Sequence, residues 1–253
     1  MINIIIPCTP NYENRNIVNT VNKSIDVVSQ FIVLYNSIKK NWKSFEYKIN
    51  LFYNKDYPFS KTDFDRLRKL DIEIFPVDAD YGEPTPFMIR CNARSHKLSE
   101  VGSHRLCLDP DMLALNEPVF ELGCDWQAMF AGKVSAGYDY INKKCNFNLK
   151  LENYLIGNGY RSYMGGANYE TLFPYFNGGA YLLKETVCGK FCELVMPCYD
   201  LCIDKNLPKT LRHMGIQYAI SFALIKLSDN WKPFKPGFNY LNKISNLNSF
   251  GLD

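Results

Sequence analysis

The apolar run MINIIIP (residues 1–7) opens the chain and stops at a proline. A short β-branched run of this kind is typical of a buried strand. Apolar residues then recur at helical spacing over Ile17–Ile38 and alternate as in a strand over Tyr47–Tyr53. A short helix is expected over Ser60–Leu70 and another strand over Ile72–Val77. This alternating order predicts an α/β fold, in which helices flank a mainly parallel central sheet.

The rest of the chain shows no internal repeat and no flexible linker, so we expect one domain over residues 1–253. Ser60 or Thr62 is expected to cap the second helix. The segment Asn142–Tyr175 is rich in glycine, asparagine and tyrosine, and it is expected to form loops and a mobile lid. The remaining expected elements are a helix over Phe87–Val101, a strand over Arg105–Leu108, a strand over Tyr181–Leu183, a helix over Val187–Ile203 interrupted near Pro197, an apolar helix over Gly215–Leu227 and an irregular end over Trp231–Asp253.

The composition excludes several classes of protein. The 253 residues include 29 basic and 26 acidic side chains, a net charge of +3, and 47% of them are hydrophobic. The chain is therefore too apolar for a disordered protein, and its scattered charges give no nucleic-acid footprint. No apolar run matches a signal peptide or a transmembrane segment, so we expect a soluble cytoplasmic protein. The nine cysteines, an odd number, are expected to be free thiols.

Two carboxylates stand where an apolar strand ends, in the stretch LCLDPDMLAL (residues 106–115). Open parallel sheets bind ligands beyond the carboxyl ends of their strands. Mg²⁺ or Mn²⁺ is commonly held by one or two carboxylates together with substrate phosphates. Asp109 and Asp111 are therefore candidate metal ligands. In the alternative interpretation Asp109 opens a turn at Pro110 and Asp111 caps the next segment.

Other segments accompany this acidic motif in a fixed order. They are PCTPNY (residues 7–12), RCNARSHKL (90–98), FNGGA (176–180), GIQYA (215–219) and WKP (231–233). Together the set resembles the GT-A-fold nucleotide-sugar glycosyltransferases, most of all the glycogenin and galactosyltransferase-like group (family 8-like). That family carries an aspartate–any–aspartate (DXD) motif like the one at Asp109. The sequence departs from it at Ile216, where the family usually has aspartate, and in lacking a histidine near Trp231.

The resemblance implies a role for each segment. Residues 1–115 would form a nucleotide-binding half and residues 116–253 an acceptor-binding half of a single Rossmann-like domain. Asp109 and Asp111 would hold Mn²⁺ or Mg²⁺ against the donor diphosphate, and Asn177 and Gln217 would act at the reacting sugar. The residues implied to bind the nucleotide sugar are Pro7, Thr9, Asn11, Tyr12, Arg90, Arg94, Lys97, Gly178 and Gly179.

The implied activity is metal-dependent hexosyl transfer (EC 2.4) in glycan biosynthesis, from a nucleoside diphosphate sugar, by resemblance a UDP-sugar, to an acceptor hydroxyl. The acceptor is a glycan, a protein or a small molecule. The resemblance favours retention of configuration, with Gln217 near the reacting carbon. An inverting enzyme would need a carboxylate base, for which Asp125, Asp139, Asp200 and Asp204 are available. The alternatives are a sugar nucleotidyltransferase and a catalytically degenerate protein that binds nucleotide sugar or glycan.

A second set of candidate ligands lies later in the chain. Cys188, Cys192, Cys198 and Cys202 include pairs at helical spacing, which could suggest zinc. No Cys-x-x-Cys pair is present, and a buried free cysteine commonly serves as a small hydrophobic residue. We therefore expect these thiols to be packing residues.

Overall fold

The structure is a computed structural model, and it describes residues 1–8, 27–55, 58–77, 102–132, 175–203 and 219–235. For residues 129–132, 175, 177 and 197–203 it describes the backbone alone. The strands are β1 (Ile2–Pro7), β2 (Tyr47–Asn54), β3 (Glu73–Val77), β4 (His104–Leu108), β5 (Trp126–Gly132), β6 (Tyr175–Lys184) and β7 (Trp231–Pro233). The helices are α1 (Val27–Asn41), α2 (Lys61–Leu67) and α7 (Glu185–Ile203), and residues 219–227 are also helical.

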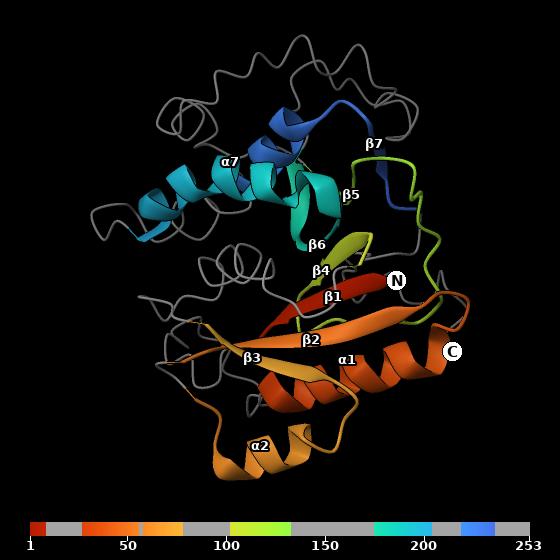
Figure 1. Cartoon of the computed structure of the whole chain (residues 1–253), viewed down its shortest axis with the longest axis vertical. Helices are drawn as coiled ribbons and strands as arrows, with labels where there is room; N and C mark the ends of the chain where they lie inside the picture. Colours follow the sequence, from red (N-terminus) through yellow and green to blue (C-terminus); the bar gives the residue numbers. More distant parts are fainter. Residues whose placement is uncertain (9–26, 56–57, 78–101, 133–174, 204–218, 236–253) are drawn as a thin grey trace.

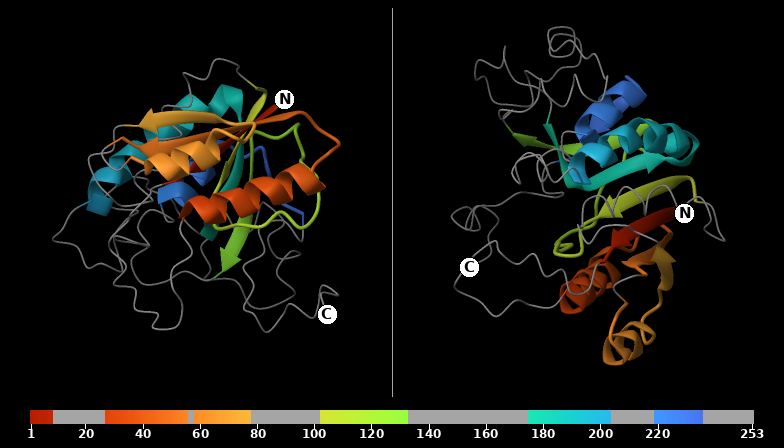
Figure 2. Two further views of the ribbon diagram at one scale, coloured as in Figure 1. Left: turned by 90° about the horizontal axis from the view of Figure 1, so that it is seen from below. Right: turned by 90° about the vertical axis from the view of Figure 1, so that its left-hand side faces the viewer.

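The strands form one sheet of 7 strands in the order β3-β2-β1-β4-β6-β5-β7. Strands β1 to β4 pair in parallel, as β5 and β7 do, whereas β6 runs antiparallel to both β4 and β5. Figures 1 and 2 show β2, β3, α1 and α2 at one end of the molecule and β5, β6 and α7 at the other. The expected α/β fold with a mainly parallel sheet is therefore confirmed.

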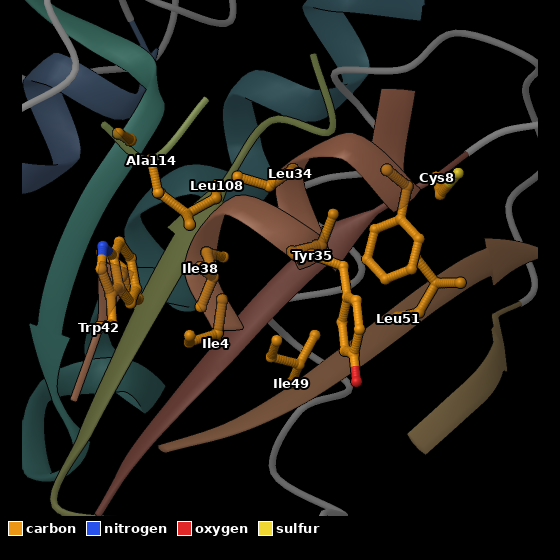
Figure 3. Packing of buried hydrophobic residues seen from close by; sticks show 14 of the residues in the cluster. Ile4, Cys8, Leu34, Tyr35, Ile38, Trp42, Ile49, Leu51, Leu108 and Ala114 are labelled. Atoms are coloured by element: carbon orange, nitrogen blue, oxygen red, sulfur yellow. The ribbon is translucent and has the colours of Figure 1, made fainter. Parts of the chain in front are cut away.

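Helix α1 covers one face of the sheet. Alternate residues of β1, beginning at Ile2, pack with residues of α1 in a single hydrophobic cluster. Figure 3 shows Ile4, Ile49 and Leu108 of the strands close to Ile38 of the helix. All four of these side chains are essentially inaccessible to water, so the burial of apolar area holds α1 on the sheet.

Helix α7 packs on the other face, beside a buried ion pair. Arg105 of β4 is only 2% exposed, and its guanidinium donates through Nε to the Glu185 carboxylate at 2.5 Å and through Nη2 to the second oxygen. Glu185 is the first residue of α7, where the helix dipole favours a negative charge. Phe191 of α7 contacts Tyr181 of β6, with 5.5 Å between ring centroids. The ion pair thus ties the start of α7 to the centre of the sheet.

Several predicted elements agree with the structure within a few residues. The strands expected over residues 1–6, 47–53, 72–77 and 105–108 correspond to β1, β2, β3 and β4. Ser60, not Thr62, caps α2, because its Oγ accepts a hydrogen bond from the Asp63 backbone N–H at 3.1 Å. Helix α1 runs past Ile38 to Asn41, and residues 17–26 lie outside the described part of the chain.

Other predictions were wrong. Strand β6 begins at Tyr175, well before the expected Tyr181, so Gly178 and Gly179 lie inside the strand. Helix α7 runs through Pro197 without the expected break. Proline cannot donate the usual backbone hydrogen bond to the residue four positions earlier, here Glu193, which is exposed. Strands β5 and β7 were not predicted, because β5 lacks alternation and β7 has only 3 residues.

The thiols agree with expectation where the structure describes them. The five described cysteines are all buried thiols outside any disulfide, namely Cys8, Cys107, Cys124, Cys188 and Cys192. None of the helices in the described ranges is both long and apolar enough to cross a membrane. The expected helix over residues 87–101 and the expected lid over residues 142–174 lie outside the described residues.

We predict that Glu185→Gln lowers the free energy of unfolding by about 3 kcal/mol, because it leaves the buried Arg105 charge without its counter-charge. Urea unfolding followed by circular dichroism measures the change. Glu193→Gln is the matched control, since it makes the same substitution at an exposed position of the same helix. Equal and small effects of the two substitutions would show that the ion pair does not hold α7 on the sheet.

Candidate functional site

The candidate site begins where β4 ends. All five residues of β4 are buried, and β4 lies between β1 and β6 in the sheet. Asp109 follows directly and is half-buried, whereas Asp111 is exposed. A central strand therefore delivers the first carboxylate to the carboxyl edge of the parallel strands, and the second stands further out toward solvent.

A backbone hydrogen bond joins the acidic motif to β6. The Asp109 N–H donates to the carbonyl oxygen of Gly179 at 2.8 Å. This bond continues the antiparallel register in which Leu108 lies opposite Ala180. Gly178 and Gly179 are both buried. The acidic motif and the glycine pair, far apart in the sequence, are therefore neighbours in the fold.

Strand β6 departs from β5 at the same place. Ala128 of β5 lies opposite Tyr181, whereas Phe130 lies opposite Phe176, so two steps along β5 match five along β6. The glycine pair falls inside this irregularity. Bulges of this kind often lie beside functional sites, because they redirect the backbone locally. A segment without Cβ atoms lets another group approach the backbone closely.

Pro7 ends β1 at the same edge of the sheet. Strands β1 and β4 are parallel, and Ile5 lies opposite Cys107. In this register Pro7, two residues after Ile5, lies level with Asp109, two residues after Cys107. Pro7 is buried, and the N–H of the next residue, Cys8, donates to Phe52 of β2 at 2.7 Å. The end of β1 is therefore held in place beside the acidic motif.

The electrostatics of the site favour a cation. Desolvation, followed by the negative charge of Asp111, raises the pKa of Asp109 from 3.8 to about 7. Two nearby carboxylates that resist joint ionisation are relieved by a divalent ion with oxygen ligands. The chemistry of this pair therefore fits Mn²⁺ or Mg²⁺. Within the described ranges no group of three or more potential protein ligands is present.

The structure places only part of the predicted site. It brings together Pro7, Asp109, Asp111, Gly178 and Gly179 at one edge of the sheet. Asn177 lies in β6 next to this group, with its backbone alone described. The predicted site residues outside the described part of the chain are Thr9, Asn11, Tyr12, Arg90, Arg94, Lys97 and Gln217.

One of the four candidate bases is excluded by its position. Asp125 immediately precedes β5, and β5 runs in the same direction as β4, so Asp125 lies at the opposite edge of the sheet from Asp109. Its carboxylate accepts a hydrogen bond from Ser228 Oγ at 2.5 Å. Asp125 therefore serves the fold and is too far from Asp109 to act on the same ligand. Of the other candidates, Asp139 and Asp204 lie outside the described residues and Asp200 has its backbone alone described.

Around the described thiols of α7 there is no group of three or more candidate metal ligands among the residues that the structure describes. Burial raises the pKa of Cys192 to about 11 and that of Cys188 still further, so both thiols stay protonated near neutral pH. A metal-binding cysteine must be a thiolate. The two residues pack against the sheet as small hydrophobic side chains, as expected.

No family model and no curated protein matches this sequence. Among solved structures, an active-site mutant of LgtC is similar at 13% identity and a TM-score of 0.45, covering 91% of this chain and 72% of that one. Galactosyltransferase LgtC with donor and acceptor sugar analogues is similar at 12% identity and a TM-score of 0.43, with the same coverage. The glycosyltransferase GlyE of Streptococcus pneumoniae is similar at 12% identity and a TM-score of 0.46. The match covers 94% of this chain and 46% of the GlyE chain.

The raised pKa of Asp109 makes the stability of the metal-free protein depend on pH. Between about pH 4 and pH 7 the unfolded chain has lost this proton and the folded protein still holds it, so the free energy of unfolding falls as the pH rises. We predict that the wild type loses about 2–4 kcal/mol of free energy of unfolding relative to Asp109→Asn as the pH rises over this range.

Urea unfolding in a chelating buffer at a series of pH values measures this difference. Asp65→Asn is the matched control, because Asp65 is an exposed aspartate of α2. A difference between wild type and Asp109→Asn that stays constant with pH would contradict the burial of this carboxylate.

Proposed function

We propose that this protein is a metal-dependent glycosyltransferase that moves a hexose from a nucleoside diphosphate sugar, in particular a UDP-sugar, to an acceptor hydroxyl. One observation carries the proposal. The Asp109 N–H is bonded to Gly179, so the start of the acidic motif lies beside a buried glycine pair at the carboxyl edge of the sheet. An anionic diphosphate and a neutral sugar need these two surroundings next to each other.

The acidic side of the site would take the diphosphate. Asp109 and Asp111 would hold Mn²⁺ or Mg²⁺, and such an ion supplies compensation for the charge that develops on a departing diphosphate. Asp109 is fixed through its backbone, whereas Asp111 is exposed and accessible to a ligand. By resemblance, the side chains of Arg90, Arg94 and Lys97 would add positive charge near the same phosphates.

The glycine side would take the sugar. Gly178 and Gly179 lie where β6 leaves β5, and the lack of Cβ atoms there would let a sugar ring come close to the backbone. By resemblance, Asn177 and Gln217 would hydrogen-bond the sugar near its reacting carbon, and both side chains are uncharged. Pro7 ends the strand whose following residues, Thr9, Asn11 and Tyr12, are proposed to bind the nucleoside.

We predict that the purified protein, given a panel of nucleotide sugars and Mn²⁺, releases free nucleoside diphosphate from one of them, by transfer or by slow hydrolysis. Asp111→Ala should lower this rate by about a hundredfold or more, because it removes a metal ligand. Asp65→Ala is the control, since it deletes an exposed carboxylate on α2 and should leave the rate unchanged.

The same assay separates the alternatives. Pyrophosphate exchange in place of diphosphate release would identify a sugar nucleotidyltransferase. Binding of a nucleotide sugar without turnover would identify a degenerate binding protein. Full metal-stimulated activity in Asp111→Ala would overturn the assignment of the metal ligands.

A further inference from the structure

The segment that follows the acidic motif is fastened to α1 through one residue. Ala114 is buried, its N–H donates to Ser37 Oγ at 2.9 Å, and its carbonyl oxygen accepts from Asn41 Nδ2 at 2.6 Å. Ser37 and Asn41 are four residues apart and therefore lie on one face of the helix. Both backbone polar groups of a single loop residue are thus satisfied by side chains of α1, as a neighbouring strand would satisfy them.

Further hydrogen bonds hold the next residues in the same way. The Trp42 indole N–H donates to the carbonyl of Asn116 at 3.0 Å. The Glu117 carboxylate accepts from the backbone N–H groups of Lys43 and Ser44, just beyond the end of α1. Residues 114–117 are therefore bonded along their length to the C-terminal end of the helix.

The two leucines of this segment contribute little to the attachment. Leu113 and Leu115, on either side of Ala114, are 56% and 48% exposed. Ala114 enters the hydrophobic cluster next to Leu108 (Figure 3), and partly buried Met112 and Phe120 pack against the same cluster. Directional hydrogen bonds from α1, together with this packing, fix where the segment lies.

The acidic motif therefore lies between two anchors. At one end the Asp109 N–H is bonded to Gly179 of β6, and at the other Ala114 is bonded to α1. Asp111 stands between them and is exposed, so neighbouring side chains do little to fix it. The backbone anchors determine how far its carboxylate can move relative to that of Asp109.

We propose that Ser37 and Asn41 are positioning residues that hold Asp111 in reach of a metal ion shared with Asp109. The inference rests on the proposed function. Mg²⁺-like ions demand a narrow range of ligand geometry, and a ligand that is held in place before binding loses less entropy when the ion binds. Ser37 is itself fixed, because it is buried and its hydroxyl donates to the Leu34 carbonyl at 2.7 Å.

The experiment titrates each variant with Mn²⁺, with and without UDP, and follows free Mn²⁺ by electron paramagnetic resonance. Ser37→Ala removes the acceptor of the Ala114 N–H, and Asn41→Asp removes the donor to its carbonyl. Each should raise the Mn²⁺ dissociation constant by about tenfold. Ser37→Thr, which keeps the hydroxyl, should restore the affinity. The KM for Mn²⁺ should rise while kcat at saturating Mn²⁺ stays near the wild-type value.

Two matched controls lie on the same helix. Ser29→Ala removes a serine whose hydroxyl accepts from Arg66 of α2 at 2.8 Å, away from the loop. Asn36→Asp is the control for Asn41→Asp, since it makes the same charge change at an exposed position of the helix. Both control variants should bind Mn²⁺ as the wild type does. Circular dichroism is used to check that every variant is folded.

The outcomes separate the two proposals. If the wild type binds Mn²⁺ through Asp111 but Ser37→Ala and Asn41→Asp match their controls, the positioning role is wrong and the proposed function stands. If the wild type binds no Mn²⁺ and Asp111→Ala changes nothing, the proposed metal site itself fails.

Discussion

The hydrogen bond from the Asp109 N–H to the Gly179 carbonyl, 2.8 Å long, determines the geometry of the candidate site. It extends the pairing of β4 and β6 by one residue beyond β4, so the acidic motif leaves the sheet in a fixed direction. Strand β4 pairs with β1 in parallel and with β6 in antiparallel fashion. The acidic motif thus emerges where the parallel part of the sheet meets its antiparallel strand, with Pro7 on one side and the glycine pair on the other.

The rest of the fold holds β4 from both faces. On one face its alternate side chains join the cluster under α1, and on the other Arg105 is paired with Glu185 of α7. The rigid strand holds the Asp109 carboxylate where its ionisation is unfavourable, because burial and the charge of Asp111 raise its pKa to about 7. An electrostatic penalty of this kind in an otherwise well-packed fold is expected at functional positions, and a bound cation would relieve it.

The sequence predicted what local patterns encode. The apolar runs of β1 to β4 and the position of Asp109 after a buried strand could be recognised without a structure. Strand β6 was mostly missed because its glycines are poor strand formers, and pairing with β4 overrides that preference. The bond to Gly179 depends on register between distant strands. Ser37 and Asn41 resemble ordinary helix polar residues, so no sequence signal marks their bonds to Ala114.

The central claim is that Asp109 and Asp111 share one metal ion beside the glycine pair. Anomalous diffraction at a manganese-sensitive wavelength, from a crystal soaked with Mn²⁺ and UDP, tests it most directly. The account predicts a manganese peak at coordination distance from carboxylate oxygens of both aspartates, with diphosphate oxygens completing its ligands. A manganese peak elsewhere, or diphosphate bound away from both carboxylates, would contradict the account.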